Sequence, residues 1–286
     1  MPELPFVTTV VENLAPLVRG RTVDEVVVRG VSVLKTFDPS IADLRGRRVL
    51  GVRRRGKLLV LDFTGDLVLV IHLRRNGRLK AVPRGTGRTA RDLAFVLVLD
   101  RGPDIQMIEI GSKKAASVWL YSAGRLAEAE PLLGLGIEPL SPEFTADALA
   151  RALRGARMRL KAFLVTQRYV VGIGNTYADE ILWEARLSPQ AMTTSLDEGE
   201  IGRLHDAIAS TLRRGIEVHR GAAAGGLPMK EPLEGLAVHR KGGEPCPRCG
   251  ARVAVIYYED RETYYCPVCQ AAGKVYADRR RSRLLR

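Results

Sequence analysis

Two residues directly behind Met1, Pro2 and Glu3, combine a potential nucleophile with an acid. If Met1 is removed, Pro2 carries a secondary amine at the chain terminus, and a terminal amine titrates near pH ~7.7–8.0. A useful fraction is then an uncharged nucleophile at neutral pH, and such amines form Schiff bases with sugar carbons. The same residues also suit an ordinary helix start, because Pro at an early helical position needs no N–H. The pair by itself leaves both interpretations open.

The cysteines form a second group with chemical meaning. They follow the pattern C-x2-C-x16-C-x2-C, which lies within the spacing of a four-cysteine zinc site, and they are Cys246, Cys249, Cys266 and Cys269. Four thiolates complete the tetrahedral coordination of Zn²⁺, so we predict one structural ion with no position open for chemistry. A pair of redox dithiols is the alternative interpretation.

The stretch between the two cysteine pairs, VAVIYYEDRETYYC, contains two strand-like runs around a polar turn. We therefore predict a zinc-finger β-hairpin with Arg261 near its tip. An Arg at that place can donate two parallel hydrogen bonds to a phosphate, although it can equally be one more surface Arg. The chain closes on ADRRRSRLLR, which is either a further phosphate contact or a disordered basic end.

The net charge indicates the kind of partner. The 286 residues contain 45 Lys and Arg against 32 Asp and Glu, which gives +13 at pH 7 and a pI near 10.0. An excess of this size suits a polyanion, most often nucleic acid; a solvated basic surface without a partner is the alternative. The sequence shows neither a signal peptide nor an apolar run of membrane-spanning length, so we expect a cytoplasmic protein without membrane contact.

Runs rich in β-branched residues dominate the first 121 residues and predict short strands. The runs lie at 21–30, 47–63, 66–73, 92–100, 104–110 and 116–121. Runs of this length and spacing are typical of a β-sandwich or barrel. The preceding segment, 1–20, has a more helical rhythm.

After about residue 140 the pattern becomes helical. Residues 141–155 have a helix start at Ser141-Pro142 or at Thr145, and a capping box at Ser195 and Glu198 predicts the start of a longer helix. Residues 221–236 are rich in Gly, Ala and Pro, and form either a plain linker or a functional flap.

These patterns predict an α+β multidomain chain. An N-terminal β-sandwich is expected at 1–135, a helical domain with the mobile loop at 136–236, and the cysteine-bearing unit at 237–286.

Several stretches resemble the formamidopyrimidine-DNA glycosylase and endonuclease VIII family. They are MPELP, RRRGKLLVL around Lys57, IHLRRNGRL, VVGIGNTYADEILWEARLSP and CPRC…RETYYCPVCQ. Together they span nearly the whole chain in the family's order, which implies a β-sandwich, a helix–two-turn–helix domain and a zinc finger. The resemblance also implies a base-excision DNA glycosylase with an attached apurinic/apyrimidinic (AP) lyase activity.

The resemblance assigns roles residue by residue. Pro2 would attack C1′ of the damaged nucleotide and form a Schiff base, and Glu3 would protonate the sugar ring oxygen. Lys57 and Arg261 would bind phosphates beside the flipped nucleotide. Asn175, expected as the N-cap of the helix TYADEILWEA, would present backbone N–H groups to the same DNA strand. Flipping is required, because C1′ cannot be attacked while the base remains stacked.

Three single positions depart from the family pattern. Phe6 stands where the family usually has a second acidic residue that assists the chemistry. Arg75, in HLRRNG, occupies the position of a Met wedge that fills the hole left by the flipped base. Thr166 stands where the family pattern has an Asp.

A further departure concerns GSKKAASV. Ala115 and Ala116 align with the Arg and Phe that fill the gap and inspect the orphaned base, while Lys113 and Lys114 keep the positive charge toward DNA. We therefore expect DNA binding and lyase chemistry to be retained and the reading of the opposite base to be altered. The preferred damaged base does not follow from the sequence.

Two functions from different classes fit these residues. The first is an active glycosylase/AP lyase, expected to be a monomer that acts on damaged DNA in duplex, bubble or single-stranded form. The second is a non-catalytic DNA-binding paralogue that recognises abasic or distorted DNA and has lost the chemistry through Phe6. A zinc-ribbon RNA-binding factor also fits the charge, but it leaves MPELP and GIGN unexplained.

Overall fold

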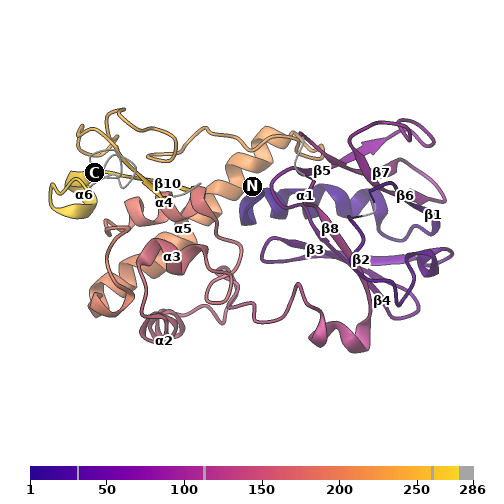
Figure 1. Ribbon diagram of the computed structural model, residues 1–286, viewed down its shortest axis with the longest axis horizontal. Coiled ribbons are helices and arrows are strands. Elements are labelled where there is room, and N and C mark those ends of the chain that lie inside the picture. Colours follow the sequence, from indigo (N-terminus) through magenta and orange to yellow (C-terminus); the bar gives the residue numbers. More distant parts are fainter. Residues whose placement is uncertain (31, 112–113, 259–260, 277–286) are drawn as a thin grey trace, which may run out of the picture. The chain divides into compact units, whose positions relative to one another are not determined.

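The computed structural model describes the chain apart from residues 31, 112–113, 259–260 and 277–286, and is drawn in Figure 1. The chain divides into two compact units. The first comprises residues 1–134 and 216–232, and the second comprises residues 135–215 and 233–286. The division near residue 135 lies where strand-forming sequence gives way to helix-forming sequence.

The first unit is a β-sandwich, as predicted. Within the described residues, one antiparallel four-stranded sheet has the order β1-β6-β7-β5, and a second has the order β2-β3-β4-β8. The first sheet consists of β1 (Val23–Val28), β6 (Leu93–Leu99), β7 (Asp104–Glu109) and β5 (Gly77–Val82). The second consists of β2 (Val49–Arg55), β3 (Leu58–Phe63), β4 (Leu67–His72) and β8 (Ser117–Ser122). Alternate apolar residues of both sheets form one continuous core.

Two details of the strand prediction were wrong. The run 47–63 is not one strand but the hairpin β2–β3, because Gly56 adopts a left-handed φ of 56° and reverses the chain. Strand β5 was missed, since the segment Gly77–Val82 has Val82 as its one β-branched residue, although its polar and apolar residues alternate. Gly77, its first residue, is required by packing, because an added Cβ would lie 2.5 Å from the carbonyl oxygen of Leu73.

Helix α1 (Leu4–Val18) confirms the helical rhythm expected near the N-terminus. Its apolar stripe enters the sandwich core, and the helix packs against β2 and β3; the buried stripe residues are Phe6, Val7, Val10, Leu14 and Val18. Glu3 takes the extended N-cap conformation, so Pro2 and Glu3 are held at the buried start of this helix. The 3₁₀ turn η1 (Ile41–Leu44) connects β1 to β2, and the 3₁₀ turn η2 (Ala123–Glu128) follows β8.

The second unit begins with helices. They are α2 (Ala146–Ala156), α3 (Leu160–Val165), α4 (Asn175–Glu184), the 3₁₀ turn η3 (Thr193–Ser195) and α5 (Glu198–Ala223), whose last turns belong to the first unit. Thr145 caps α2 by accepting the N–H of Ala148 at 3.1 Å, which confirms the second of the two predicted starts.

The predicted capping box at Ser195 and Glu198 was wrong. The reciprocal bonds are made two residues later, where Asp197 Oδ1 accepts the Glu200 N–H at 2.7 Å and Glu200 Oε2 accepts the Asp197 N–H at 3.2 Å. Ser195 instead closes η3, because its hydroxyl donates to the Met192 carbonyl oxygen.

The cysteine-bearing part of the second unit is small. It consists of the antiparallel hairpin β9 (Ala254–Tyr258) and β10 (Arg261–Tyr265), followed by the one-turn helix α6 (Pro267–Ala271). This confirms the predicted β-hairpin between the two cysteine pairs. Among the described residues, no helix combines the length and the apolar character that crossing a membrane would need.

Candidate catalytic and DNA-binding site

The structure brings Pro2, Glu3 and Lys57 together in the first unit. Pro2 and Glu3 are buried at the start of α1, and Lys57 sits in the β2–β3 turn with 6% of its surface exposed. Burial lowers the pKa of the Lys57 amine, and the negative charges of Glu3 and Glu231 partly oppose that shift. The cluster thus holds a cation and an acid beside the N-terminal segment, in surroundings that exclude much of the water.

Local structure fixes Lys57 in this position. Arg54 donates to the Gly56 carbonyl oxygen at 3.0 Å and closes the turn. In the neighbouring pairing of β3 with β4, His72 lies opposite Leu58, the residue that follows Lys57. Burial, with the charges of Arg74 and Lys57, lowers the pKa of His72 to about 3, so its imidazole is neutral near physiological pH.

Phe6, which replaces the family's second acid, is a core residue. Its ring is 1% exposed, packs edge-on against His219 at 6.0 Å and lies under the Arg78 guanidinium at 5.1 Å. Arg78 also donates to the carbonyl oxygen of Met229 at 2.9 Å and to the Glu231 carboxylate at 3.3 Å. Sequence reasoning missed both Arg78 and Glu231, because one lies in the unpredicted strand β5 and the other in a segment without periodicity.

Arg75 lies in the tight β4–β5 connection, and its side chain is exposed. Arg74 before it adopts a left-handed φ of 52°, and the Arg75 carbonyl oxygen accepts a hydrogen bond from Arg78 at 3.2 Å. The turn therefore presents Arg75 to solvent from a backbone that is well held.

The segment after β7 is fixed by Glu109, which is 3% exposed. Its Oε1 accepts hydrogen bonds from the backbone N–H groups of Ala115 at 2.6 Å and Ala116 at 2.8 Å. Its backbone carbonyl oxygen accepts a hydrogen bond from the Lys114 ammonium at 2.8 Å. Lys114 and Ala115 are exposed, whereas Ala116 is buried in the sandwich core. Lys113 lies outside the described residues.

Asn175 is exposed at the start of α4, but it is not the N-cap. Gly174 takes that place with extended backbone, and Asn175 is the first helical residue. Gln167 organises the two turns before the helix, because it accepts the Gly172 N–H at 2.8 Å and donates to the Ile173 carbonyl oxygen at 2.9 Å. A helix start of this kind favours an anion through its N–H groups and its dipole.

Two further predicted positions lie in the second unit. Arg261 begins β10 and pairs through its backbone with Tyr258; its side chain is outside the described residues. Thr166, where the family pattern has an Asp, ends α3, and its hydroxyl donates to the Ala162 carbonyl oxygen at 2.7 Å.

The four cysteines converge as a metal site requires. Their sulfur atoms all lie within 4.8 Å of one another, with Cys246 and Cys269 4.0 Å apart and Cys249 and Cys266 3.4 Å apart. Thiolates that bind Zn²⁺ at about 2.3 Å lie about 3.8 Å from each other in a tetrahedron, so the donor set fits this ion. The Trp183 indole N–H donates to Cys246 Sγ at 3.3 Å, an outer contact that orients the ligand.

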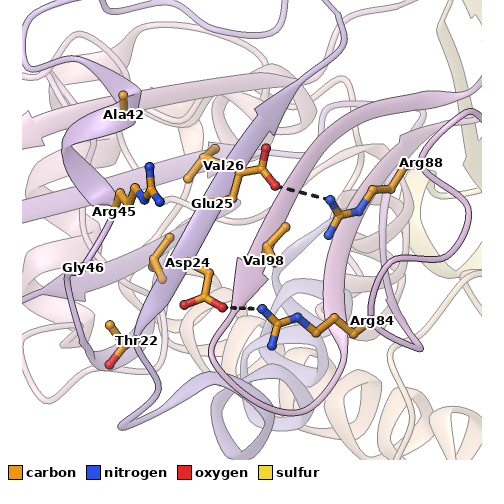
Figure 2. A pocket seen from close by; sticks show the side chains of 11 residues that line it. Thr22, Asp24, Glu25, Val26, Ala42, Arg45, Gly46, Arg84, Arg88 and Val98 are labelled. Atoms are coloured by element: carbon orange, nitrogen blue, oxygen red, sulfur yellow. Dashed lines mark hydrogen bonds and ion pairs between the residues drawn. The ribbon is translucent and has the colours of Figure 1, made fainter.

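A separate pocket of about 740 Å³ lies on the sandwich beside β1 (Figure 2). Four of its charged side chains pair with one another, Arg84 with Asp24 and Arg88 with Glu25 at 3.3 Å. None of the predicted site residues lines this pocket. It is therefore not the candidate catalytic site.

Family models match three parts of the chain. The "Formamidopyrimidine-DNA glycosylase N-terminal domain" matches residues 1–110, the "Formamidopyrimidine-DNA glycosylase H2TH domain" matches residues 135–224, and the "Zinc finger found in FPG and IleRS" matches residues 243–272. The three matches follow the order of the sandwich, the helical part and the cysteine hairpin.

Similar whole proteins and structures agree with these matches. The formamidopyrimidine-DNA glycosylases of Pelotomaculum thermopropionicum and Chloroflexus aurantiacus are 35% and 36% identical to this chain, over 94% of it and 99% and 98% of their own lengths. A Lactococcus lactis enzyme variant crystallised with a Fapy-dG containing DNA has a TM-score of 0.85 at 30% identity, covering 94% of this chain and 100% of its own. The Thermus thermophilus protein has a TM-score of 0.81 at 34% identity, covering 94% and 98%.

The β-sandwich, the helix–two-turn–helix part and the four-cysteine finger, together with the similar proteins, define a DNA glycosylase of base excision repair. The four cysteines hold one structural Zn²⁺. The chain belongs to the formamidopyrimidine-DNA glycosylase family, in which AP-lyase activity typically accompanies base removal.

Proposed function

We propose that this glycosylase acts through the Pro2 amine, exposed after removal of Met1, and that it also cleaves the DNA strand as an AP lyase. The observation that carries the proposal is the joint burial of Pro2 and Glu3 beside Lys57, in a chain with the family's full architecture. A carboxyl group and a cation around a terminal amine are the groups that a Schiff-base reaction at a sugar needs.

The proposed chemistry balances with these residues alone. The lone pair of Pro2 forms the N–C1′ bond while the bond from C1′ to the base breaks, and its electrons leave with the base. Glu3 gives a proton to the ring oxygen, whose bond to C1′ breaks as the sugar opens. The nitrogen gives its N–H proton to the departed base anion, so that nitrogen and C1′ form an iminium. The Glu3 carboxylate then takes a C2′ proton, and the electrons of that C–H bond move toward C3′ and expel the 3′ phosphate by elimination. No redox step is involved.

DNA contacts are proposed in both units. Lys57, Asn175 and Arg261 bind phosphates around the flipped nucleotide, and Arg75, Lys113 and Lys114 face the duplex beside it. The net charge of +13 supports a polyanionic substrate. We place the sandwich at 1–135, the helix–two-turn–helix domain at 136–236 and the finger at 237–286, and we place the enzyme in the cytoplasm.

The substrates to test first are those named for structural relatives, DNA that contains Fapy-dG and DNA with an abasic site. We expect the protein to release the damaged base from the first substrate. In both substrates we expect it to cut the strand that carries the lesion, by elimination. Specific binding of abasic DNA without any base release or incision would instead establish the non-catalytic DNA-binding paralogue. The comparison uses protein whose N-terminus has been confirmed by intact mass.

A further inference from the structure

We infer that Glu231, in the segment after α5, is a catalytic residue that accepts a proton from the terminal amine, and that it supplies the carboxylate that Phe6 lacks. This inference rests on the proposed function. The Glu231 carboxylate pairs with the N-terminal ammonium and accepts its hydrogen bond; the two carboxylate oxygens lie 3.3 Å and 3.4 Å from the Met1 nitrogen. Its own negative charge also acts on Lys57. A carboxylate from a distant part of the sequence thus faces both the chain terminus and the cation of the site.

Arg78 holds this carboxylate in place. Arg78 is a buried residue, with 9% of its surface exposed. Its guanidinium donates hydrogen bonds to Glu231 Oε1 at 3.3 Å and to the Met229 carbonyl oxygen at 2.9 Å. Two bonds from one planar group to one short segment fix the direction of that segment as well as its distance. Glu231 is therefore placed by a buried residue of strand β5.

Apolar contacts anchor the same segment. Leu227 packs against the sandwich core, and Met229 packs against a second cluster made by Leu93, Val96, Val98 and Ile108. The N-terminal helix contributes too, because Asn13 bonds the Gly226 carbonyl oxygen. Residues 226–231 are consequently bound to the sandwich along their length, which favours a functional segment over a plain linker.

Phe6 and Glu231 form a complementary arrangement through Arg78. An acid at position 6 would lie under the Arg78 guanidinium and would compete with Glu231 for it. The Phe6 ring instead offers its face at 5.1 Å, which stabilises the guanidinium without occupying its hydrogen-bond donors. Those donors stay with the Glu231 carboxylate and with the backbone carbonyl oxygens of Met229, Arg75 and Gly77. The Arg78 side chain thus links the absence of a carboxylate at Phe6 to the placement of the Glu231 carboxylate.

The geometry assigns Glu231 a proton-accepting task. Once Met1 is removed, the terminus moves by one residue, about 3.8 Å along the chain, and becomes the Pro2 amine. The protonated amine has no free lone pair, so it must lose a proton before it attacks C1′. That proton passes to Glu231 Oε, the N–H bond electrons remain on nitrogen as the lone pair, and the carboxylate becomes a neutral acid.

The charges around this amine come from several elements. Glu3 precedes α1, Lys57 lies in the β2–β3 turn, and Arg78 projects from β5. On the side of α5, His219 packs against Phe6. Of these groups, Glu231 is the one in direct contact with the ammonium, so its removal should affect the reaction of the amine most directly.

The test is borohydride trapping of Met1-free protein on abasic-site duplex DNA, under single-turnover conditions from about pH 5 to about pH 9. Glu231→Gln is compared with wild type, with Glu231→Asp as the conservative rescue. Glu234→Gln, the same change at an exposed position three residues away, serves as the control. DNA affinity is measured for each variant.

We expect Glu231→Gln to lower the trapping rate about 100-fold, as for loss of a general base. Its profile of rate against pH should move to lower pH, since the amine loses a neighbouring negative charge. DNA affinity and the Glu234→Gln control should be unchanged, and Glu231→Asp should recover part of the rate. An unaltered rate, or a lower rate with an unshifted profile, would overturn the inference. Absence of any crosslink in wild type would contradict the proposed function itself.

Discussion

The ammonium of Lys161 on α3 bonds the backbone carbonyl oxygen of Glu262 on β10 at 2.6 Å. The same ammonium lies 2.7 Å from Asp179 Oδ1 on α4, and the other oxygen of Asp179 lies 2.8 Å from His239 Nδ1. Both Lys161 and Asp179 are buried. A buried ion pair thus connects the helical part of the second unit to the strand that begins with Arg261.

Lys161→Met should loosen β10 and weaken DNA binding while the zinc stays bound. The change removes the Lys161 cation from the buried Asp179 and leaves it His239, and breaking a buried ion pair costs about 3 kcal/mol or more. Hydrogen exchange should become faster in β9 and β10, and the affinity for abasic DNA should fall. Arg151→Met, an exposed change on α2, is the control. Unchanged exchange in the hairpin would show that the pair does not hold the finger.

Lys57→Met should stabilise the first unit and reduce activity. The folded-state pKa of Lys57 is lowered, so the protonated amine costs stability at pH 7, and this cost disappears as the pH rises toward the unfolded value of 10.5. We expect the variant to melt about 2–4 °C higher at pH 7, with a smaller difference near pH 10. Thermal unfolding at both pH values measures it, with exposed Lys35→Met as the control. A lower melting temperature of Lys57→Met than of wild type at pH 7 would contradict the expected stabilisation.

Removing the zinc should unfold the finger locally. The hairpin and α6 bury little apolar surface of their own, so their folding depends on metal binding. After complete chelation we expect loss of protection in β9, β10 and α6, unchanged protection in β2, β3 and β4, and DNA affinity lower by about tenfold. Full metal loss without local unfolding or weaker binding would assign the cysteines another role.

The lesion should be processed in single-stranded or bubble DNA at least as well as in duplex. Ala115 is exposed but small, and Ala116 is buried, so neither fills the gap left by a flipped base. An unfilled gap forfeits stacking worth a few kcal/mol, and that penalty is small where no duplex stack exists. Cleavage of one lesion in single strand, bubble, and duplex opposite each base tests this. Strong preference for duplex opposite cytosine would show that Arg75 supplies the missing reader.

The sequence predicted much of the fold, because its signals are local. Cysteine spacing predicted the finger, and β-branched runs with turn residues predicted all the sandwich strands except the division at Gly56 and strand β5. The cap positions near Asn175 and Ser195 were wrong by one or two residues, because neighbouring residues can supply the same backbone conformation or hydrogen bonds.

The tertiary part of the site could not be predicted. Glu231 and Arg78 lie 153 residues apart in sequence, and Glu231 has no periodic or motif context. Likewise, nothing local marks Lys161 as the partner of Glu262, 101 residues away. Contacts of this kind depend on how elements pack, whereas caps, turns and ligand spacing depend on neighbouring residues.

The most direct test of the proposed mechanism is to locate the covalent bond to DNA. Met1-free protein is incubated with abasic-site DNA and borohydride, and the crosslinked peptide is sequenced by mass spectrometry. A matched sample carries an uncleaved N-terminal extension, which blocks the Pro2 nitrogen without altering the folded residues. We expect one crosslink, at the Pro2 nitrogen, and none in the extended protein. An equal yield from the extended protein, or a crosslink at a lysine such as Lys57, would contradict the assignment of Pro2 as the nucleophile.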